Sequence, residues 1–336
     1  MVRLVYLVIA GACVAAAACA SNNNNTFDNG VPDSGKLLPD GAIAPDLDGG
    51  NGLKDGGNGN PDGAAGPSVI YAHTDTELYS MDPMTQKVTD IGAFTGQTGA
   101  VTDLAVNSAG DVWVNTENAI FKAAVPKSSG PVPLTKVADI KVGLTQKFYA
   151  LGFAPVGVLG MGETLVAGDN LGELYAVDGQ GALTQLGSFG SDGAGGTYEL
   201  SGDVVFYMQN NKPRGLATVR LVKQGTPDPG NDLLAEIDVP AMVTAFNSKT
   251  PAASLKKQFI GTGTKYGKLY GLGAWNDSVF AFSRVGTAKD GGTPARLIGI
   301  DKNGVGTPLQ SFPNLTAGWS GAGVTTSATI TILPPN

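Results

Sequence analysis

Short apolar strands alternate with turns throughout residues 67–336, and one type of strand recurs. Its copies place apolar residues at the first and fourth positions, usually with aspartate next: LYSMD at 78–82, IFKAA at 120–124, LYAVD at 174–178, LAEID at 234–238 and LIGID at 297–301. We expect the aspartate to begin a turn, because Asp, Pro, Asn and Gly favour turn geometry. A further strand follows the turn, as in KVTDIGAF, LTKVADI, ALTQLGSF and TPLQSF. The pattern therefore predicts antiparallel hairpins.

A second kind of strand, rich in glycine and alanine, lies upstream of each hairpin. Its five copies are VTDLAVN from 101, YALGFAP from 149, LSGDVVF from 200, YGLGAWN from 270 and WSGAGVT from 319. Gly and Ala are poor strand formers in general, so their repeated use at this place indicates backbones that converge on an axis. Between these inner strands and the hairpins lie IYAHT, DVWVNT, ETLVAG, GLATVR and SVFAFS. Each unit thus has four strands.

Four-stranded units repeated around an axis predict an all-β fold, a single β-propeller. The first hairpin has no inner strand before it, and the last inner strand has no hairpin after it. Pairing of the N- and C-terminal strands would complete one blade and close the ring, which favours five blades over six. The 49 glycines and the 15% of charged residues agree with a turn-rich sheet protein. A β-sandwich is the alternative for many short strands.

Residues 1–19 have the layout of an export signal, in which Arg3 precedes an apolar run and small residues precede Cys19. The ending AAAAC resembles the lipobox of bacterial lipoproteins, whose cysteine becomes the lipid-modified first residue after cleavage. Two alternatives stay open, namely lipidation at Cys13 after IAGA and ordinary cleavage without a lipid. Export is common to all three.

Residues 20–66 are rich in Gly, Asn and Asp, and they contain almost no aromatic side chain. Such a stretch cannot bury enough apolar surface to offset the entropy of ordering it, so we expect a disordered, flexible tether. It holds seven aspartates against two lysines and supplies most of the net charge of −7. Its DLDGGNGLKDGGNGNPDG stretch lacks the closing Glu of an EF-hand loop. Residues 67–336 are then the propeller domain.

The hairpin LYSMDPMTQ and the closing GWSGAGVTT resemble those of predicted Gram-negative bacterial lipoproteins. In that family a signal and a Gly/Asp-rich linker precede a small extracytoplasmic propeller built on LYxxDPxTG-like hairpins. The resemblance covers the whole chain and implies a cell-envelope lipoprotein, held to the membrane by a lipid anchor at Cys19. Ala20 after the cysteine favours the outer membrane, on its periplasmic or surface face. The family implies no established activity.

Two aspartates form the most suggestive chemical constellation in the domain. Asp103 in VTDLAV and Asp203 in LSGDVV occupy the same position of the inner strand, in blades two apart, and Glu199 is close to Asp203 in the sequence. Two carboxylates across a cleft suffice for glycoside hydrolysis. They could instead coordinate a structural Ca²⁺ with backbone carbonyls, although no cofactor is otherwise expected. The structural alternative is that each accepts hydrogen bonds from backbone groups at a blade junction.

Two aromatic features have structural explanations. The single histidine, His73, ends the strand IYAHT, and the aligned positions of other blades hold Asn115 and Phe282, which indicates an ordinary strand-end residue. Trp113, Trp275 and Trp319 could serve as sugar-stacking platforms, but tryptophans usually bury their surface in a core.

The balance of 22 basic against 29 acidic residues argues against a nucleic-acid partner, which requires clustered Lys and Arg. Residues 210–232 collect four basic side chains, Lys212, Arg214, Arg220 and Lys223, in what we expect to be a long loop. Envelope proteins or a polysaccharide are the expected partners there. The sequence therefore favours a binding or scaffold module for protein or glycan. The alternative is a carbohydrate-active enzyme, a glycoside hydrolase or lyase, that uses the channel carboxylates.

Overall fold

The protein is represented by a computed structural model that describes residues 69–141, 146–227, 231–275, 278–284 and 293–328. The predicted signal (1–19) with Cys13 and Cys19, and the predicted tether (20–66), lie outside the described residues.

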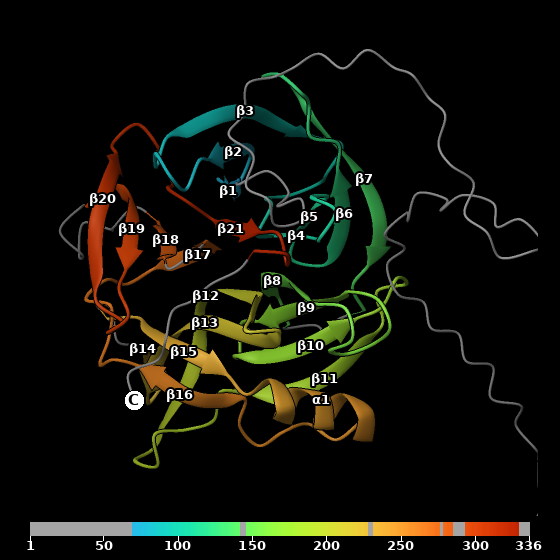
Figure 1. Cartoon of the computed structure of the whole chain (residues 1–336), viewed down its shortest axis with the longest axis vertical. Helices are drawn as coiled ribbons and strands as arrows, with labels where there is room; N and C mark the ends of the chain where they lie inside the picture. Colours follow the sequence, from blue (N-terminus) through green and yellow to red (C-terminus); the bar gives the residue numbers. More distant parts are fainter. Residues whose placement is uncertain (1–68, 142–145, 228–230, 276–277, 285–292, 329–336) are drawn as a thin grey trace, which may run out of the picture.

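In the described part of the chain, the strands form five four-stranded antiparallel blades around a common axis (Figure 1). The outer strands of the first two blades, β3 (Val88–Thr95) and β7 (Val132–Asp139), also pair in parallel, which joins these two blades into one eight-stranded sheet. The first blade contains β21 (Gly321–Val324), β1 (Ile70–His73), β2 (Glu77–Met81) and β3 (Val88–Thr95), and the second contains β4 (Asp103–Val106), β5 (Val112–Asn115), β6 (Ala119–Ala123) and β7 (Val132–Asp139). The third contains β8 (Phe148–Ala154), β9 (Thr164–Asp169), β10 (Glu173–Val177) and β11 (Leu183–Ser188). The fourth contains β12 (Gly196–Gln209), β13 (Lys212–Lys223), β15 (Leu233–Ile237) and β16 (Lys256–Ile260), with the short β14 (Thr226–Pro227) beside β13. The fifth contains β17 (Leu269–Trp275), β18 (Ser278–Ser283), β19 (Ala295–Ile300) and β20 (Gly306–Phe312).

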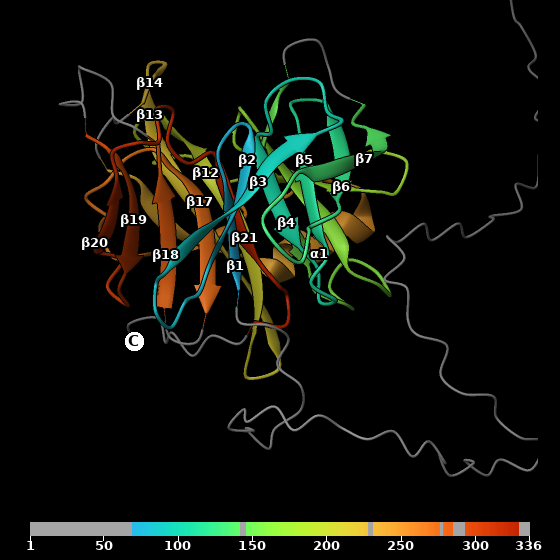
Figure 2. The same cartoon turned by 90° about the horizontal axis from the view of Figure 1, so that it is seen from above.

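The ring is closed by pairing strands from opposite ends of the domain. Strand β21 pairs antiparallel with β1, with Ile70 opposite Val324 and His73 opposite Gly321. This first blade is thus assembled from the first and last described strands, and the two strands lie side by side in both views (Figures 1 and 2). The predicted closed propeller of five blades is confirmed, and the β-sandwich alternative is excluded.

The inner strands β4, β8, β12, β17 and β21 are crowded, as their small residues predicted. A Cβ atom on Gly152 would lie 2.7 Å from the carbonyl oxygen of Val204 in the next inner strand. A Cβ atom on Gly271 would lie 2.6 Å from the amide nitrogen of Ala322. Glycine is needed at these positions because neighbouring backbones approach too closely for a side chain.

Aspartates begin the turns between the third and fourth strands, as the hairpin pattern predicted. A carboxylate oxygen of Asp82 accepts from the amide of Met84 at 2.8 Å, and one of Asp178 accepts from Ala182 at 2.8 Å. Asp301 makes the corresponding bond to Val305 at 2.9 Å. These side-chain hydrogen bonds satisfy backbone donors that the sheet leaves free, which fixes each turn.

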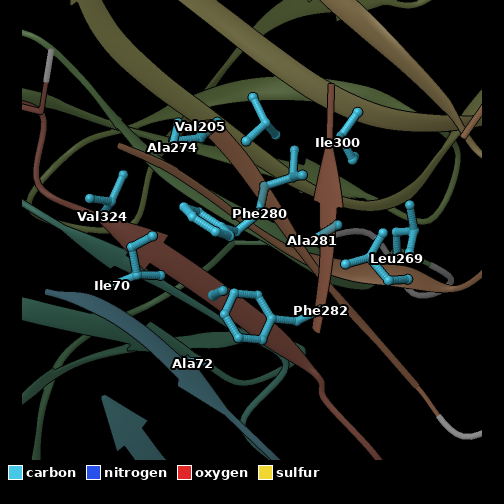
Figure 3. Close-up of a cluster of buried hydrophobic side chains, with 14 of the residues drawn as sticks. Ile70, Ala72, Val205, Leu269, Ala274, Phe280, Ala281, Phe282, Ile300 and Val324 are labelled. Atoms are coloured by element: carbon cyan, nitrogen blue, oxygen red, sulfur yellow. The ribbon is translucent and has the colours of Figure 1, made fainter. Parts of the chain in front are cut away.

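Buried apolar side chains fill the spaces between adjacent blades. The largest cluster joins the fifth blade to its neighbours (Figure 3) and includes Ile70, Leu269, Phe280, Phe282 and Val324. Trp319 has no exposed surface and makes edge-to-face contacts with three rings, and Trp113 is 7% exposed. These two tryptophans are therefore core residues that hold blades together, and Trp275 packs against the same cluster as Trp319.

The fourth blade departs from the predicted pattern in two ways. Helix α1 (Val239–Ser248) is inserted between its third and fourth strands, where no helix was predicted. Asp238 caps the helix by accepting from the amide of Ala241 at 3.0 Å. The expected loop over residues 210–232 is wrong, because most of that segment is the long strand β13, paired with β12 along eleven residue pairs.

Candidate functional site at the channel mouth

A cavity of about 510 Å³ opens at the end of the channel where the inner strands begin. Two rings of residues line it, and each blade contributes one residue to each ring. The inner ring comes from the inner strands or the residues just before them: Thr102, Tyr149, Gly202, Tyr270 and Ser320. The outer ring comes from the second strand of each blade or the turn that follows it: Asp75, Glu117, Asn170, Arg220 and Arg284.

Sheet register explains why the outer-ring residues converge. Gly321 pairs with His73, and Asp75 lies two residues beyond that partner. The same spacing relates Glu117 to the pair Asp103–Asn115, Asn170 to Ala150–Gly168 and Arg284 to Gly271–Phe282. These four equivalent positions point to one axis, and Arg220 of the fourth blade lines the same cavity.

On one side of the cavity, Asp75, Arg284 and Ser320 form a saturated polar cluster. Arg284 donates to both carboxylate oxygens of Asp75, at 2.9 and 3.0 Å, and to the hydroxyl of Ser320 at 2.6 Å. Ser320 donates in turn to Asp75. Burial acts to raise the pKa of Asp75, but the hydrogen bonds from Arg284 and Ser320 outweigh it and lower that pKa. The cluster connects the first blade to the fifth.

The two other carboxylates of the cavity also have partners. Glu117 accepts from Lys147 Nζ at 2.8 Å and from the Tyr149 hydroxyl at 3.4 Å. Asp169 accepts from the amides of Leu171 and Glu173, both at 2.9 Å. Partial burial, followed by the charge of Glu117, raises the pKa of Tyr149, so this side chain stays a neutral phenol at neutral pH.

Arg220 is the least engaged charge in the cavity. Its Nη2 lies 3.7 Å from Glu199, beyond hydrogen-bond length, and its buried Nε has no hydrogen-bond partner among the described residues. Glu199 faces this arginine across the β12–β13 ladder and is not among the residues that line the cavity. The predicted grouping of Glu199 with the two channel aspartates is therefore not found in this structure.

One residue further along the inner strands, Asp103 and Asp203 meet on the axis. Neither has exposed surface, and their carboxyl groups are hydrogen-bonded to each other. Asp103 accepts from the amides of Leu104 at 2.8 Å and Leu151 at 2.7 Å. Burial raises the pKa of both residues, and two carboxyl groups in contact must share a proton.

The aspartate pair connects all five inner strands. Asp203 accepts from Val204 at 2.5 Å, from Leu272 at 2.8 Å and from Ala322. Together with the bonds of Asp103, these reach β4, β8, β12, β17 and β21. These contacts match the structural alternative, in which each aspartate accepts hydrogen bonds from backbone amides at a blade junction. The catalytic and calcium alternatives stay predictions.

His73 lies beside this pair and has no exposed surface. Its Nδ1 is 2.7 Å from the carbonyl oxygen of Thr74, and its Nε2 is 4.0 Å from Asp103 Oδ1. Burial lowers the pKa of His73 to about 4, so the ring is neutral at neutral pH and donates from Nδ1. Among the described residues, no group of three or more His, Cys, Asp or Glu side chains is arranged to hold a metal ion.

The outer ring and the two tyrosines of the inner ring were not anticipated as a site from the sequence. A signal was present, because the strands IYAHT, DVWVNT, ETLVAG, GLATVR and SVFAFS end next to the ring residues. The residues at or just beyond those strand ends include Asp75, Glu117, Asn170, Arg220 and Arg284. Charged residues at equivalent strand ends of a closed ring lie close to the same axis. When each strand is read separately, the same residues look like ordinary exposed polar residues.

Strand order and closure define the protein as a five-bladed β-propeller with a cavity at its channel mouth. No family model matches the chain, and no curated protein sequence matches it. A protein of unknown function from Bacteroides caccae is similar in structure, with 9% identity and a TM-score of 0.39, over 77% of this chain and 98% of that one. The Dos1 propeller has 14% identity and a TM-score of 0.34, over 74% of this chain and 57% of that one. The fold assignment rests on the sheet topology.

Proposed function

We propose that this protein is a ligand-binding module of the bacterial cell envelope, exported and anchored by a lipid at Cys19. Its binding site is the cavity at the channel mouth. One observation supports the site above all: all five blades contribute to a cavity of about 510 Å³, within the range of about 300–1,000 Å³ usual for small-molecule sites. In this role the closed ring is a rigid frame, and its strand ends present the recognition groups.

Blocking the mouth tests the site. Ala100 is an exposed residue that lines the cavity, so Ala100→Trp would place an indole in the opening without changing the core. We expect this variant to fold normally and to lose at least about tenfold in affinity for envelope glycans or proteins captured by the wild type. Met161→Trp is the matched control, because Met161 is 80% exposed in the connection between β8 and β9. Equal capture by all three proteins would refute the mouth as the binding site.

The anchor is tested independently of the site. Cells that express the full chain with radiolabelled palmitate should label the wild type and Cys13→Ser but not Cys19→Ser. Label that depends on Cys13, or no label at all, would refute the proposed anchor. No helix among the described residues is long and apolar enough to cross a bilayer.

Catalysis is outside this proposal. Asp103 and Asp203 have no exposed surface, and backbone amides already occupy their carboxylate oxygens. A general acid for glycoside cleavage must reach the glycosidic oxygen of its substrate. The enzymatic alternative would gain support if turnover on polysaccharides were observed and then lost in Asp103→Asn.

A further inference from the structure

Two arginines occupy equivalent places in adjacent blades, yet their surroundings differ. Arg284 makes three hydrogen bonds, two to Asp75 and one to Ser320. Arg220 has one distant carboxylate neighbour at 3.7 Å and a buried Nε without a hydrogen-bond partner in the described part of the chain. A guanidinium group has five donors in a planar fork suited to a carboxylate. Arg220 therefore lines the cavity with unused capacity for an anionic group.

The carboxylates of the cavity do not provide that anion and do not require a cation. Asp75 is neutralised by Arg284, and Glu117 is neutralised by Lys147. Asp169 is held by two backbone amides and by Gln146 Nε2 at 2.8 Å. Each retains lone pairs that accept from neutral donors. The cavity thus contains one arginine, Arg220, that can bind an anionic group, and several oxygen acceptors suited to hydroxyl groups.

Two tyrosines add flat apolar surface to the same cavity. Tyr149 is 37% exposed, and Tyr270 is partly exposed with the Arg284 guanidinium 5.6 Å from its ring centre. They come from inner strands of the third and fifth blades, and their hydroxyls are close enough to interact electrostatically. Aromatic faces pack against the C–H faces of sugar rings, whereas a polyphosphate would bring more negative charge than Arg220 alone can balance.

We infer that the cavity binds a saccharide that carries a carboxylate, of the uronic acid class, with its carboxylate on Arg220 and its hydroxyls toward Glu117 and Asp169. This inference rests on the proposed function and specifies its ligand. A neutral saccharide would leave the Arg220 fork unsatisfied, and a doubly charged anion would meet the acidic side of the cavity.

Calorimetric titration of the full mature chain tests this ligand class. The probes are galacturonate and mannuronate, which carry one carboxylate each, their neutral counterparts galactose and mannose, and dialanine as a zwitterion. We expect at least one uronate to bind, with its neutral counterpart weaker by at least about tenfold. Arg220→Gln should lose about tenfold or more for the uronate. Lys223→Gln is the matched control, since it removes a charge from the same strand outside the cavity lining and should bind like the wild type.

The other outcomes overturn the inference in distinguishable ways. Equal binding of neutral and uronate probes, or unchanged binding in Arg220→Gln, would remove the anion requirement. Tighter binding of dialanine would replace the saccharide by a zwitterion. If no probe binds with a dissociation constant below about 1 mM, the ligand class is wrong. The mouth site itself is then judged separately by capture with Ala100→Trp and Met161→Trp.

Discussion

Asp103 and Asp203 share a buried proton, and the pair links the inner strands of the propeller. Five backbone amides from five inner strands converge on this carboxyl pair. A channel axis lined by backbone offers few other acceptors, and unpaired buried amides would cost about 1–3 kcal/mol each. The proton that the pair shares removes the repulsion which two carboxylates in contact would otherwise have.

The raised pKa values of the pair predict a pH dependence of stability. Above the ordinary Asp pKa of about 3.9, the folded state holds a proton that the unfolded state releases, so stability falls as pH rises. Asp103→Asn supplies an N–H donor in place of this proton. We expect it to be less stable than the wild type by about 1–3 kcal/mol near pH 5, because one amide loses its acceptor, with the difference shrinking toward pH 8.

Denaturant unfolding of the wild type and Asp103→Asn from pH 5 to 8 measures this effect. Asp139→Asn is the control, since its carboxylate is 70% exposed. Parallel curves for the wild type and Asp103→Asn would show that the pair binds no extra proton in the fold.

The contribution of His73 to the pH dependence of stability has the opposite sign. Its pKa is lowered to about 4 by burial, so the unfolded state binds the proton more readily and stability falls as pH drops from about 6.5 toward 4. Because the chain has one histidine, a single set of imidazole NMR signals reports it. We expect the neutral Nδ1–H tautomer at pH 6, where a free imidazole is more than half protonated. A midpoint near 6.5 in the folded protein would contradict this prediction.

At the scale of elements, helix α1 is an addition to the fourth blade and packs beside the outer strand β11 of the third (Figure 1). It buries Val239, Met242 and Ala245. The helix begins with a capping aspartate followed by a proline in its first turn, and it ends at Lys249 in the left-handed conformation. A cap of this kind adds to the stability that a ten-residue helix gains from packing its buried face, because the helix's own propagation contributes little.

Removing the cap of α1 should have a small, defined cost. Asp238→Ala leaves the amide of Ala241 without its acceptor, and we expect a loss of about 1 kcal/mol in the free energy of unfolding. Asp238→Asn keeps a side-chain oxygen and should lie within about 0.5 kcal/mol of the wild type. Thermal unfolding of the three proteins measures both values, and equal stability of the Ala and Asn variants would contradict the capping role.

At the scale of the whole molecule, the closure between β1 and β21 makes stability depend on both ends of the domain. Ala72 and Ala322 face each other across this closure, and neither has exposed surface. The closure contains the greatest separation along the chain among the strand pairs of the described residues. Its contacts form only when every blade is in place, so the ring should unfold cooperatively.

A disulfide across the closure tests the ring directly. Directly opposed strand residues have Cα atoms about 4.5–5.5 Å apart, which suits a disulfide, so Ala72→Cys with Ala322→Cys should oxidise within one chain. In the chain from Ala20 onward no other cysteine is present. We expect the oxidised form to be about 2–4 kcal/mol more stable than the reduced form of the same variant, measured by denaturant unfolding. Failure to form an intramolecular disulfide under native conditions would contradict the closure.

Much of the fold could be predicted because each blade repeats the same local signals. Asp82, Asp178 and Asp301 mark turns wherever they recur, and glycines mark the crowded axis. The prediction failed in the fourth blade, where Asp238 follows a third strand as in other blades but caps a helix instead. A turn aspartate and a helix cap use the same side-chain chemistry, so the residues after it must decide between them.

The candidate site was harder to predict than the fold. Asp103 and Asp203 were correctly predicted to occupy equivalent inner-strand positions, but only the structure shows their direct hydrogen bond and complete burial. The contrast between Arg220 and Arg284 depends on neighbours more than 20 residues away in sequence or across a strand pair.

The sequence by itself determined the repeating strands, their turns, the small residues at the axis and the matching of the two chain ends, because each is recorded in local residue pattern. The tertiary structure alone decided which polar residues near the axis are charged or neutral, and which of them have their hydrogen-bonding groups occupied or free to bind a ligand. Burial and partner geometry set those properties, and both arise only when five blades bring distant strand ends to one axis.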